Sequence, residues 1–246
     1  MLFLFAILLV CPAAARAPIG PGASAAAILD QAVAAMGGET WLNPRTLILE
    51  GSATFYGPDG AIPRSRADDY RMWRAMDPGR TVAHGADGKG RILARSSGTR
   101  QFEVGYDGVT TWTDKGVMPK PAADAYWAAN FGFGIIRQAL GPDFTLERVP
   151  DRMIDGHSVA LIRILGPDGG RTLFGIDRAT RFVRYMAFAS PRGFHERSYD
   201  DFLVARGWVQ ARKVTLTYDG VVQNVVRWTK VTVDAPIDPA IFAPPR

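Results

Sequence analysis

A long hairpin near the C-terminus constrains the fold more than any other stretch of the sequence. Residues 208–218 alternate apolar and polar side chains, which is the period of a strand with one buried face. Asp219-Gly220 can adopt the positive φ angles of a tight turn, so residues 221–233 are predicted to return as the paired strand. That second strand carries apolar side chains on both faces, with Val226 and Trp228 on one of them. A strand of this kind either lies between two layers or lines an internal space.

Strand patterns separated by turn residues continue through most of the chain. They predict strands over residues 47–55, 66–76, 81–84, 90–95, 101–106, 109–113, 145–149, 158–165, 171–177, 182–189 and 194–202. Asp107-Gly108 and Asp155-Gly156 are typical turn signals, and the short connections between strands indicate an antiparallel meander. No stretch rich in Ser, Pro or charge interrupts the pattern, so we expect a single domain over residues 18–246.

Two stretches have helical rather than strand character. Ser24 is predicted to cap a helix that runs through Met36, where two glycines follow and end it. Residues 121–141 predict two short helices broken at Gly132 and Gly134. Helices inserted midway through a meander usually cover a sheet face or close an opening. The predicted class is therefore mainly β with a few helices.

The first 17 residues predict export from the cytoplasm. Residues 2–10 form an apolar core too short to cross a membrane, and small residues follow it. Residues 1–17 are therefore predicted to be a signal peptide, whose cleavage position stays open. Lipidation of Cys11 would require a small residue before it, and Val10 stands there, so we expect no lipid anchor at Cys11. Removing the segment leaves no cysteine, and hence no disulfide, in the mature domain.

The charge of the chain bears on its partners. The 246 residues carry a net charge of +5, mostly from arginines dispersed along the sequence. A basic surface favours transient contact with an anionic membrane or with an envelope protein. Neither a Lys/Arg-rich run nor a recognition motif occurs, so we expect no nucleic-acid partner.

No motif in the sequence indicates a catalytic, metal or cofactor site. The three histidines, at positions 84, 157 and 195, lack metal-ligand spacing, and the sequence has neither a Gly-x-Ser-x-Gly elbow nor a phosphate-binding loop. Adjacent carboxylates such as Asp200-Asp201 point to opposite faces of a strand, a poor geometry for paired-carboxylate catalysis. We therefore expect no enzyme, no metal and no cofactor. The alternative is a hydrolase that uses His195 with Glu196 or Asp200.

Several of these motifs occur in an order that resembles a known family. They are Tyr106-Asp107-Gly108 followed by Trp112, then residues 175–180, residues 198–202 and the tail 231–245. Over roughly residues 25–245 the chain resembles the periplasmic outer-membrane lipoprotein carrier superfamily, the LolA/LolB-like proteins. The resemblance implies a strongly curved antiparallel sheet, an unclosed half-barrel, with helices covering its concave face. It further implies a periplasmic protein that holds lipid or the acyl chain of a lipoprotein.

Aromatic residues are the candidates for the ligand-binding wall. A bent sheet needs such residues simply to pack, but an open concave face also needs a ligand or a helix to cover it. The predicted pocket residues are Phe55, Tyr70, Phe102, Trp112, Trp127, Phe131 and Trp228. Strand parity selects Tyr70 over Trp73. Residues 121–141 would form a moving lid.

A scaffold protein is the main alternative to a carrier. Its concavity would be plugged by its own helices, and its strand edges would bind a protein partner. The sequence leaves open the ligand, the partner proteins, the oligomeric state and whether the cavity is open.

Overall fold

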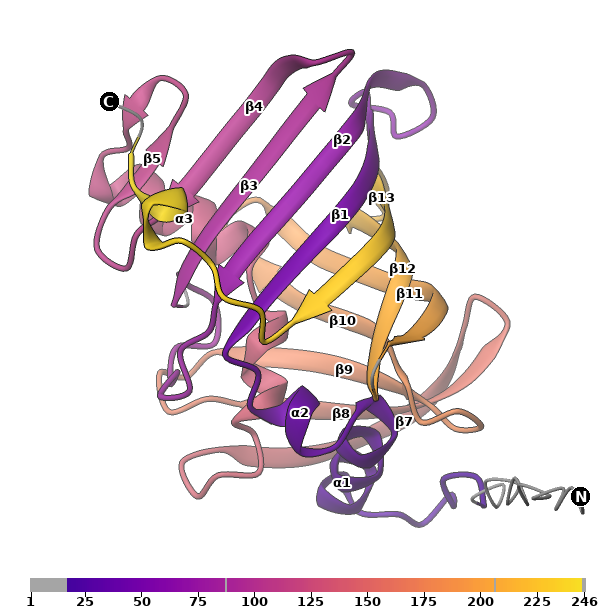
Figure 1. The fold of residues 1–246 in the computed structure, drawn as a ribbon. Helices are drawn as coiled ribbons and strands as arrows, with labels where there is room; N and C mark the ends of the chain where they lie inside the picture. Colours follow the sequence, from indigo (N-terminus) through magenta and orange to yellow (C-terminus); the bar gives the residue numbers. More distant parts are fainter. Residues whose placement is uncertain (1–16, 87, 206, 245–246) are drawn as a thin grey trace, which may run out of the picture.

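The computed structural model describes residues 17–86, 88–205 and 207–244, so residues 1–16 of the predicted signal peptide lie outside the described part of the chain. Within these residues, thirteen strands form one antiparallel sheet (Figure 1). The strands are β1 (Thr46–Tyr56), β2 (Pro63–Ala75), β3 (Lys89–Ser96), β4 (Thr99–Tyr106), β5 (Thr111–Thr113), β6 (Gly116–Val117), β7 (Thr145–Ile154), β8 (His157–Leu165), β9 (Arg171–Asp177), β10 (Val183–Ser190), β11 (Gly193–Ala205), β12 (Trp208–Tyr218) and β13 (Val221–Val233).

The strand order explains why the sheet is an open half-barrel. It runs β6-β5-β4-β3-β2-β1-β13-β12-β11-β10-β9-β8-β7, so the first strand pairs with the last and joins two arms of the sheet. The edge strands β6 and β7 do not pair with each other. Figure 1 shows the two arms facing each other across a concave space. The predicted class, mainly β with a strongly curved and unclosed antiparallel sheet, is confirmed.

The C-terminal hairpin forms as its sequence predicts. Strands β12 and β13 are antiparallel, with Val214 opposite Val226. The turn residues Asp219 and Gly220 have φ angles of 49° and 77°, the positive values that a tight two-residue turn requires. A bulge at Gln223, between the pairs Leu216–Asn224 and Thr217–Val222, adds bend and twist to β13.

Helices cover the concave face and one end of the sheet, and a short one in the C-terminal tail lies on the convex face. They are α1 (Ala25–Met36), α2 (Glu39–Leu42), α3 (Lys120–Asn130) and the 3-10 helices η1 (Phe133–Arg137) and η2 (Pro239–Phe242). The Ser24 hydroxyl accepts a hydrogen bond from the amide of Ala27 and caps α1, which packs against β7, β8 and β12. Helix α3 bridges the two arms: Trp127 donates to Thr111 of β5 at 2.7 Å, and the carbonyl of Ala129 lies 2.8 Å from Nδ1 of His195 on β11. None of the described helices has the length and apolar character needed to cross a membrane.

Residues 81–84 differ from their predicted conformation, and the tail after β13 follows a path for which no prediction was made. Residues 81–84 form a loop, not a strand, because the amide of Ala83 is bound by the Asp168 carboxylate at 2.9 Å and its carbonyl by Arg80 at 2.7 Å. The tail after β13 crosses the convex face, where Trp112 donates to the carbonyl of Phe242 at 2.7 Å. Both are contacts between residues far apart in sequence, which local periodicity does not encode.

Candidate ligand-binding cavity

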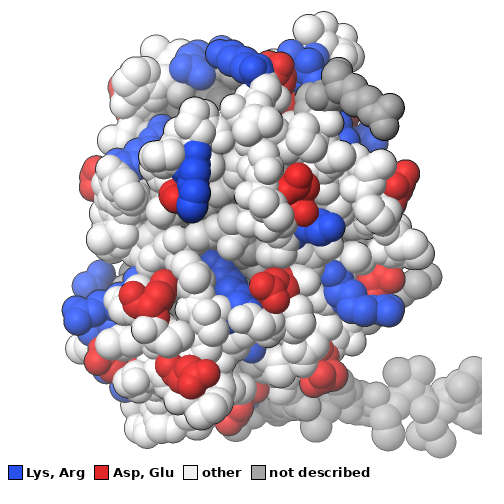
Figure 2. Space-filling model, turned by 90° about the vertical axis from the view of Figure 1, so that its left-hand side faces the viewer, with Lys and Arg blue, Asp and Glu red and all other residues white. Residues whose placement is uncertain are grey.

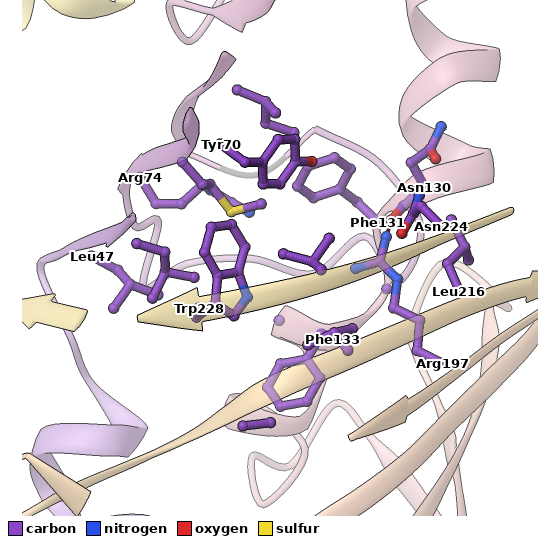
Figure 3. Close-up of a pocket in the computed structure, with 18 of the residues that line it drawn as sticks. Leu47, Tyr70, Arg74, Asn130, Phe131, Phe133, Arg197, Leu216, Asn224 and Trp228 are labelled. Atoms are coloured by element: carbon purple, nitrogen blue, oxygen red, sulfur yellow. Dashed lines mark hydrogen bonds between the residues drawn. The ribbon is translucent and has the colours of Figure 1, made fainter. Parts of the chain in front are cut away.

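A cavity of about 600 Å³ lies between the concave face of the sheet and the segment α3–η1 (Figure 3). Its volume falls within the roughly 300–1,000 Å³ of typical small-molecule sites. Most of its wall is apolar and comes from both arms of the sheet and from the covering helices. The wall includes Leu47, Leu49, Phe55, Tyr70, Met72, Ile92, Phe102, Val104, Phe131, Phe133, Val183, Phe202, Trp208, Val214, Leu216, Val226 and Trp228.

The aromatic part of the wall is built around a glycine. Gly51 of β1 lies opposite both Tyr70 of β2 and Trp228 of β13, whose ring centroids are 5.4 Å apart. A Cβ atom at Gly51 would lie 2.0 Å from the backbone carbonyl oxygen of Arg227, so only glycine allows this close approach of β1 and β13. The glycine and the bulge beside it therefore set the position of two large rings in the cavity wall.

Five of the seven predicted pocket residues line the cavity. They are Phe55, Tyr70, Phe102, Phe131 and Trp228. The rings of Phe55, Tyr70 and Phe102 form one cluster, with centroid separations of 5.6 to 6.3 Å. These residues come from β1, β2, β4, β13 and the end of α3, so the pairing of neighbouring strands and the covering segment bring them together.

The other two predicted residues, Trp112 and Trp127, lie outside the cavity wall. Trp127 is 4% exposed and its ring packs against Phe131, so it anchors α3 from behind the wall. Trp112 is 1% exposed and contacts Phe242 of the C-terminal tail on the convex side. As strand parity predicts, Tyr70 lines the cavity, whereas Trp73 packs against Arg91 on the opposite face of β2.

Comparisons with known proteins bear on this architecture. No family profile matches the chain, and none of the curated proteins does. Among solved structures, a DUF1329 family protein from Desulfovibrio piger aligns with a TM-score of 0.56 and 11% identity, over 88% of this chain and 96% of its own. A domain described as an outer membrane lipoprotein-sorting protein from Vibrio parahaemolyticus aligns with a TM-score of 0.55 and 11% identity, over 88% and 95%. A LolA superfamily protein from Nitrosomonas europaea aligns with a TM-score of 0.54 and 14% identity, over 90% and 98%.

This chain has the LolA-like fold. The predicted resemblance is thus confirmed at the level of the fold, and identities this low carry nothing further about ligand or activity. The LolA-like cavity of this chain must be interpreted from its own side chains.

Arginine side chains also line the LolA-like cavity, and the aromatic pattern did not indicate them. Arg74, Arg80, Arg137 and Arg197 all contribute to the wall. Arg74 lies over the Phe131 ring, with its guanidinium carbon 5.0 Å from the ring centroid. Arg197 alternates in phase with His195 and Tyr199 on β11, and this phase is the signal that could have placed it on the concave face.

The tyrosine hydroxyls in and around the cavity stay neutral over the physiological pH range. Burial raises the pKa of Tyr70 and of Tyr199 to about 12, and the positive charge of Arg197 only partly opposes this. Burial likewise raises the pKa of Tyr126, which lines the cavity from α3. The arginines therefore supply positive charge to the wall, which Lys115, Glu103 and Asp114 also line, while the hydroxyls offer neutral hydrogen bonds.

The residues of the hydrolase alternative do not come together. His195 is fully buried, and its Nδ1 lies 2.8 Å from the carbonyl oxygen of Ala129. Glu196 points to the opposite face of β11, where it accepts from the Tyr185 hydroxyl, and Asp200 pairs with Arg184 at 3.1 Å. Among the described residues no cluster of His, Cys, Asp or Glu could hold a metal ion.

Proposed function

We propose that this chain is an exported binding protein that carries a hydrophobic ligand, a lipid or the acyl chain of a lipoprotein, in the cavity of its LolA-like fold. The observation that carries the proposal is the apolar cavity of about 600 Å³ that the covering helices leave open. A concavity plugged by its own helices, as the scaffold alternative requires, would have had little such space. The proposed ligand contacts are Phe55, Tyr70, Phe102, Phe131 and Trp228.

Burial of an acyl chain in such a wall supplies enough free energy for binding. Each methylene transferred from water contributes about 0.8 kcal/mol. A chain of roughly sixteen carbons contributes on the order of 10 kcal/mol before the costs of ordering are subtracted. Such binding requires no catalytic group.

The segment α3–η1 is the proposed lid. It separates part of the cavity from solvent, and Phe131 and Phe133 from this segment reach into the wall. Gly132, between them, packs closely against Phe188: a Cβ atom at this position would lie only 2.7 Å from that ring. A substitution at Gly132 would therefore push the lid away from the sheet.

The cell envelope is the proposed location, with residues 1–17 as the signal peptide and residues 18–246 as the mature domain. The face in Figure 2 shows Lys and Arg side chains interspersed with Asp and Glu. Such a mixed surface supports transient contacts with an anionic membrane or an envelope protein more than a dedicated polyanion site.

Native mass spectrometry of protein purified from its own envelope tests the carrier. We expect an adduct of lipid mass, with the bound species identified after organic extraction. Val226→Trp should abolish the adduct because it fills the cavity, where Val226 is 6% exposed. Val204→Trp makes the same exchange at a side chain that is 67% exposed and should keep the adduct. Wild-type protein that carries no lipid and takes up none from added lipid would refute the proposal.

A further inference from the structure

Arg197 is a partly buried cation without a counterion among the described residues. Its Nη2 donates to the carbonyl oxygen of Asn130 at 2.8 Å, while its Nε is buried without a hydrogen-bond partner in the described part of the chain. No carboxylate of the described residues forms an ion pair with it. The hydroxyl of Tyr199, two residues along β11, is also buried without a partner among these residues.

Such an arrangement is unusual because charges in protein interiors are normally paired. Removing a charge from water is costly unless an opposite charge or several hydrogen bonds compensate for it. The neighbouring groups of Arg197 are tyrosine hydroxyls and a backbone carbonyl, which do not neutralise it. An anionic group brought by the ligand would provide the missing counterion.

Arg197 lies at one side of the cavity together with two asparagines. Figure 3 shows Arg197 beside Asn130 and Asn224, whereas Leu47 and Arg74 lie at the far side. The amides of Asn130 and Asn224 come from α3 and β13, and Arg197 from β11, so the lid and one arm of the sheet contribute to this polar side. The cavity therefore offers a positive charge and amide groups at this side, next to the apolar wall that runs from Tyr70 and Trp228 to Leu47.

Building on the proposed function, we propose that the ligand is an anionic amphiphile whose carboxylate or phosphate pairs with Arg197. The amides of Asn130 and Asn224 lie where they can donate to the same head group. The acyl chain extends from there past Tyr70 and Trp228 towards Leu47. This assigns the class of ligand, which neither the apolar wall nor the fold specifies.

Three ligands with one chain length and different head groups test the assignment. Hexadecanoate, hexadecyl phosphate and hexadecanol compete for delipidated full-length protein against an uncharged fluorescent probe, N-phenyl-1-naphthylamine. We expect at least one anion to bind about tenfold or more tightly than hexadecanol, the effect of a charge-assisted hydrogen bond. The tighter of the two anions indicates whether a fatty acid or a phosphate-bearing lipid is the source.

Variants at Arg197 separate the head group from the chain. Arg197→Gln should remove the preference for the anion over hexadecanol, whereas Arg197→Lys should retain part of that preference. Arg212→Gln removes the same charge from an exposed position on β12 and should change nothing. Thermal unfolding of each variant verifies that it is folded, and the wild-type comparison of the three ligands does not depend on any variant.

The outcomes distinguish this inference from the function on which it rests. Equal binding of hexadecanol and both anions by wild type, or a preference that persists in Arg197→Gln, would overturn the head-group assignment and leave the hydrophobic carrier intact. Failure of all three ligands to displace the probe would refute the carrier and the assignment together.

Discussion

At the scale of single residues, two imidazoles near the cavity, those of His195 on β11 and of His84, resist protonation. Burial and then the positive charge of Arg197 lower the pKa of His195 to about 2. Burial lowers the pKa of His84 to about 4, and the Phe188 ring is stacked between the two imidazoles. Both histidines are therefore neutral in the folded protein at neutral pH, and they act as packing groups under the lid.

Buried neutral histidines make the stability depend on pH in a defined direction. In the unfolded chain a histidine binds a proton below about pH 6.5, whereas folded His195 does not, so its contribution is present above that pH and is lost as the pH falls. We expect the melting temperature of wild type to fall more between about pH 7.5 and pH 5 than that of His195→Gln.

The matched control for this prediction is His157→Gln, because the side chain of His157 is 41% exposed. It should keep the steep pH dependence of wild type. Identical pH dependence of wild type and His195→Gln would contradict the structural account of His195.

At the scale of elements, α3 is the cover that both arms of the sheet hold in place. Near its C-terminal end Trp127 donates a hydrogen bond to Thr111. In the same turn the carbonyl oxygen of Ala129 lies against His195 and Tyr218. Residues 120–125 of the helix are exposed apart from Ala123, so opening should cost less than global unfolding.

Hydrogen exchange tests whether α3 moves when ligand binds. We expect the amides of α3 to exchange more slowly when hexadecanol occupies the cavity, because the ligand packs against Phe131 and stabilises the closed lid. The amides of α1, outside the lid, serve as the internal control and should change little. Equal protection of α3 with and without ligand would rule out a moving lid.

At the scale of the whole molecule, the pairing of β1 with β13 makes one sheet of two arms. The cavity wall takes residues from both arms, so neither arm could bind ligand alone. One large cluster of buried apolar residues extends through α1, η1 and both arms, which favours cooperative unfolding.

Equilibrium unfolding in urea tests this cooperativity. Transitions followed by tryptophan fluorescence and by far-UV circular dichroism should coincide, because Trp112 and Trp208 report on different arms of the same sheet. Two separated transitions would show that the arms unfold independently and would contradict the single-domain prediction.

Much of this architecture follows from local features of the sequence. Alternation of apolar and polar residues located β1 and β12, because it encodes which face of a strand is buried. Turn pairs such as Asp219-Gly220 located the hairpins, because their backbone angles are set within a few residues. The same alternation placed Tyr70 and Trp228 on the concave side. The LolA-like fold and the aromatic wall were therefore predictable.

Only the tertiary structure decided which side chains share the cavity and what else lies there. Trp112 has the aromatic side chain expected of a pocket residue, but the C-terminal tail folds over it on the convex face. Residues 81–84 have strand character, but bonds from Asp168 and Arg80 hold them as a loop. In the sequence Arg197 resembles the other dispersed arginines, and only the tertiary structure shows that it lines the cavity. These outcomes depend on contacts between distant segments, whereas the periodicity of a sequence encodes only the burial of each segment in turn.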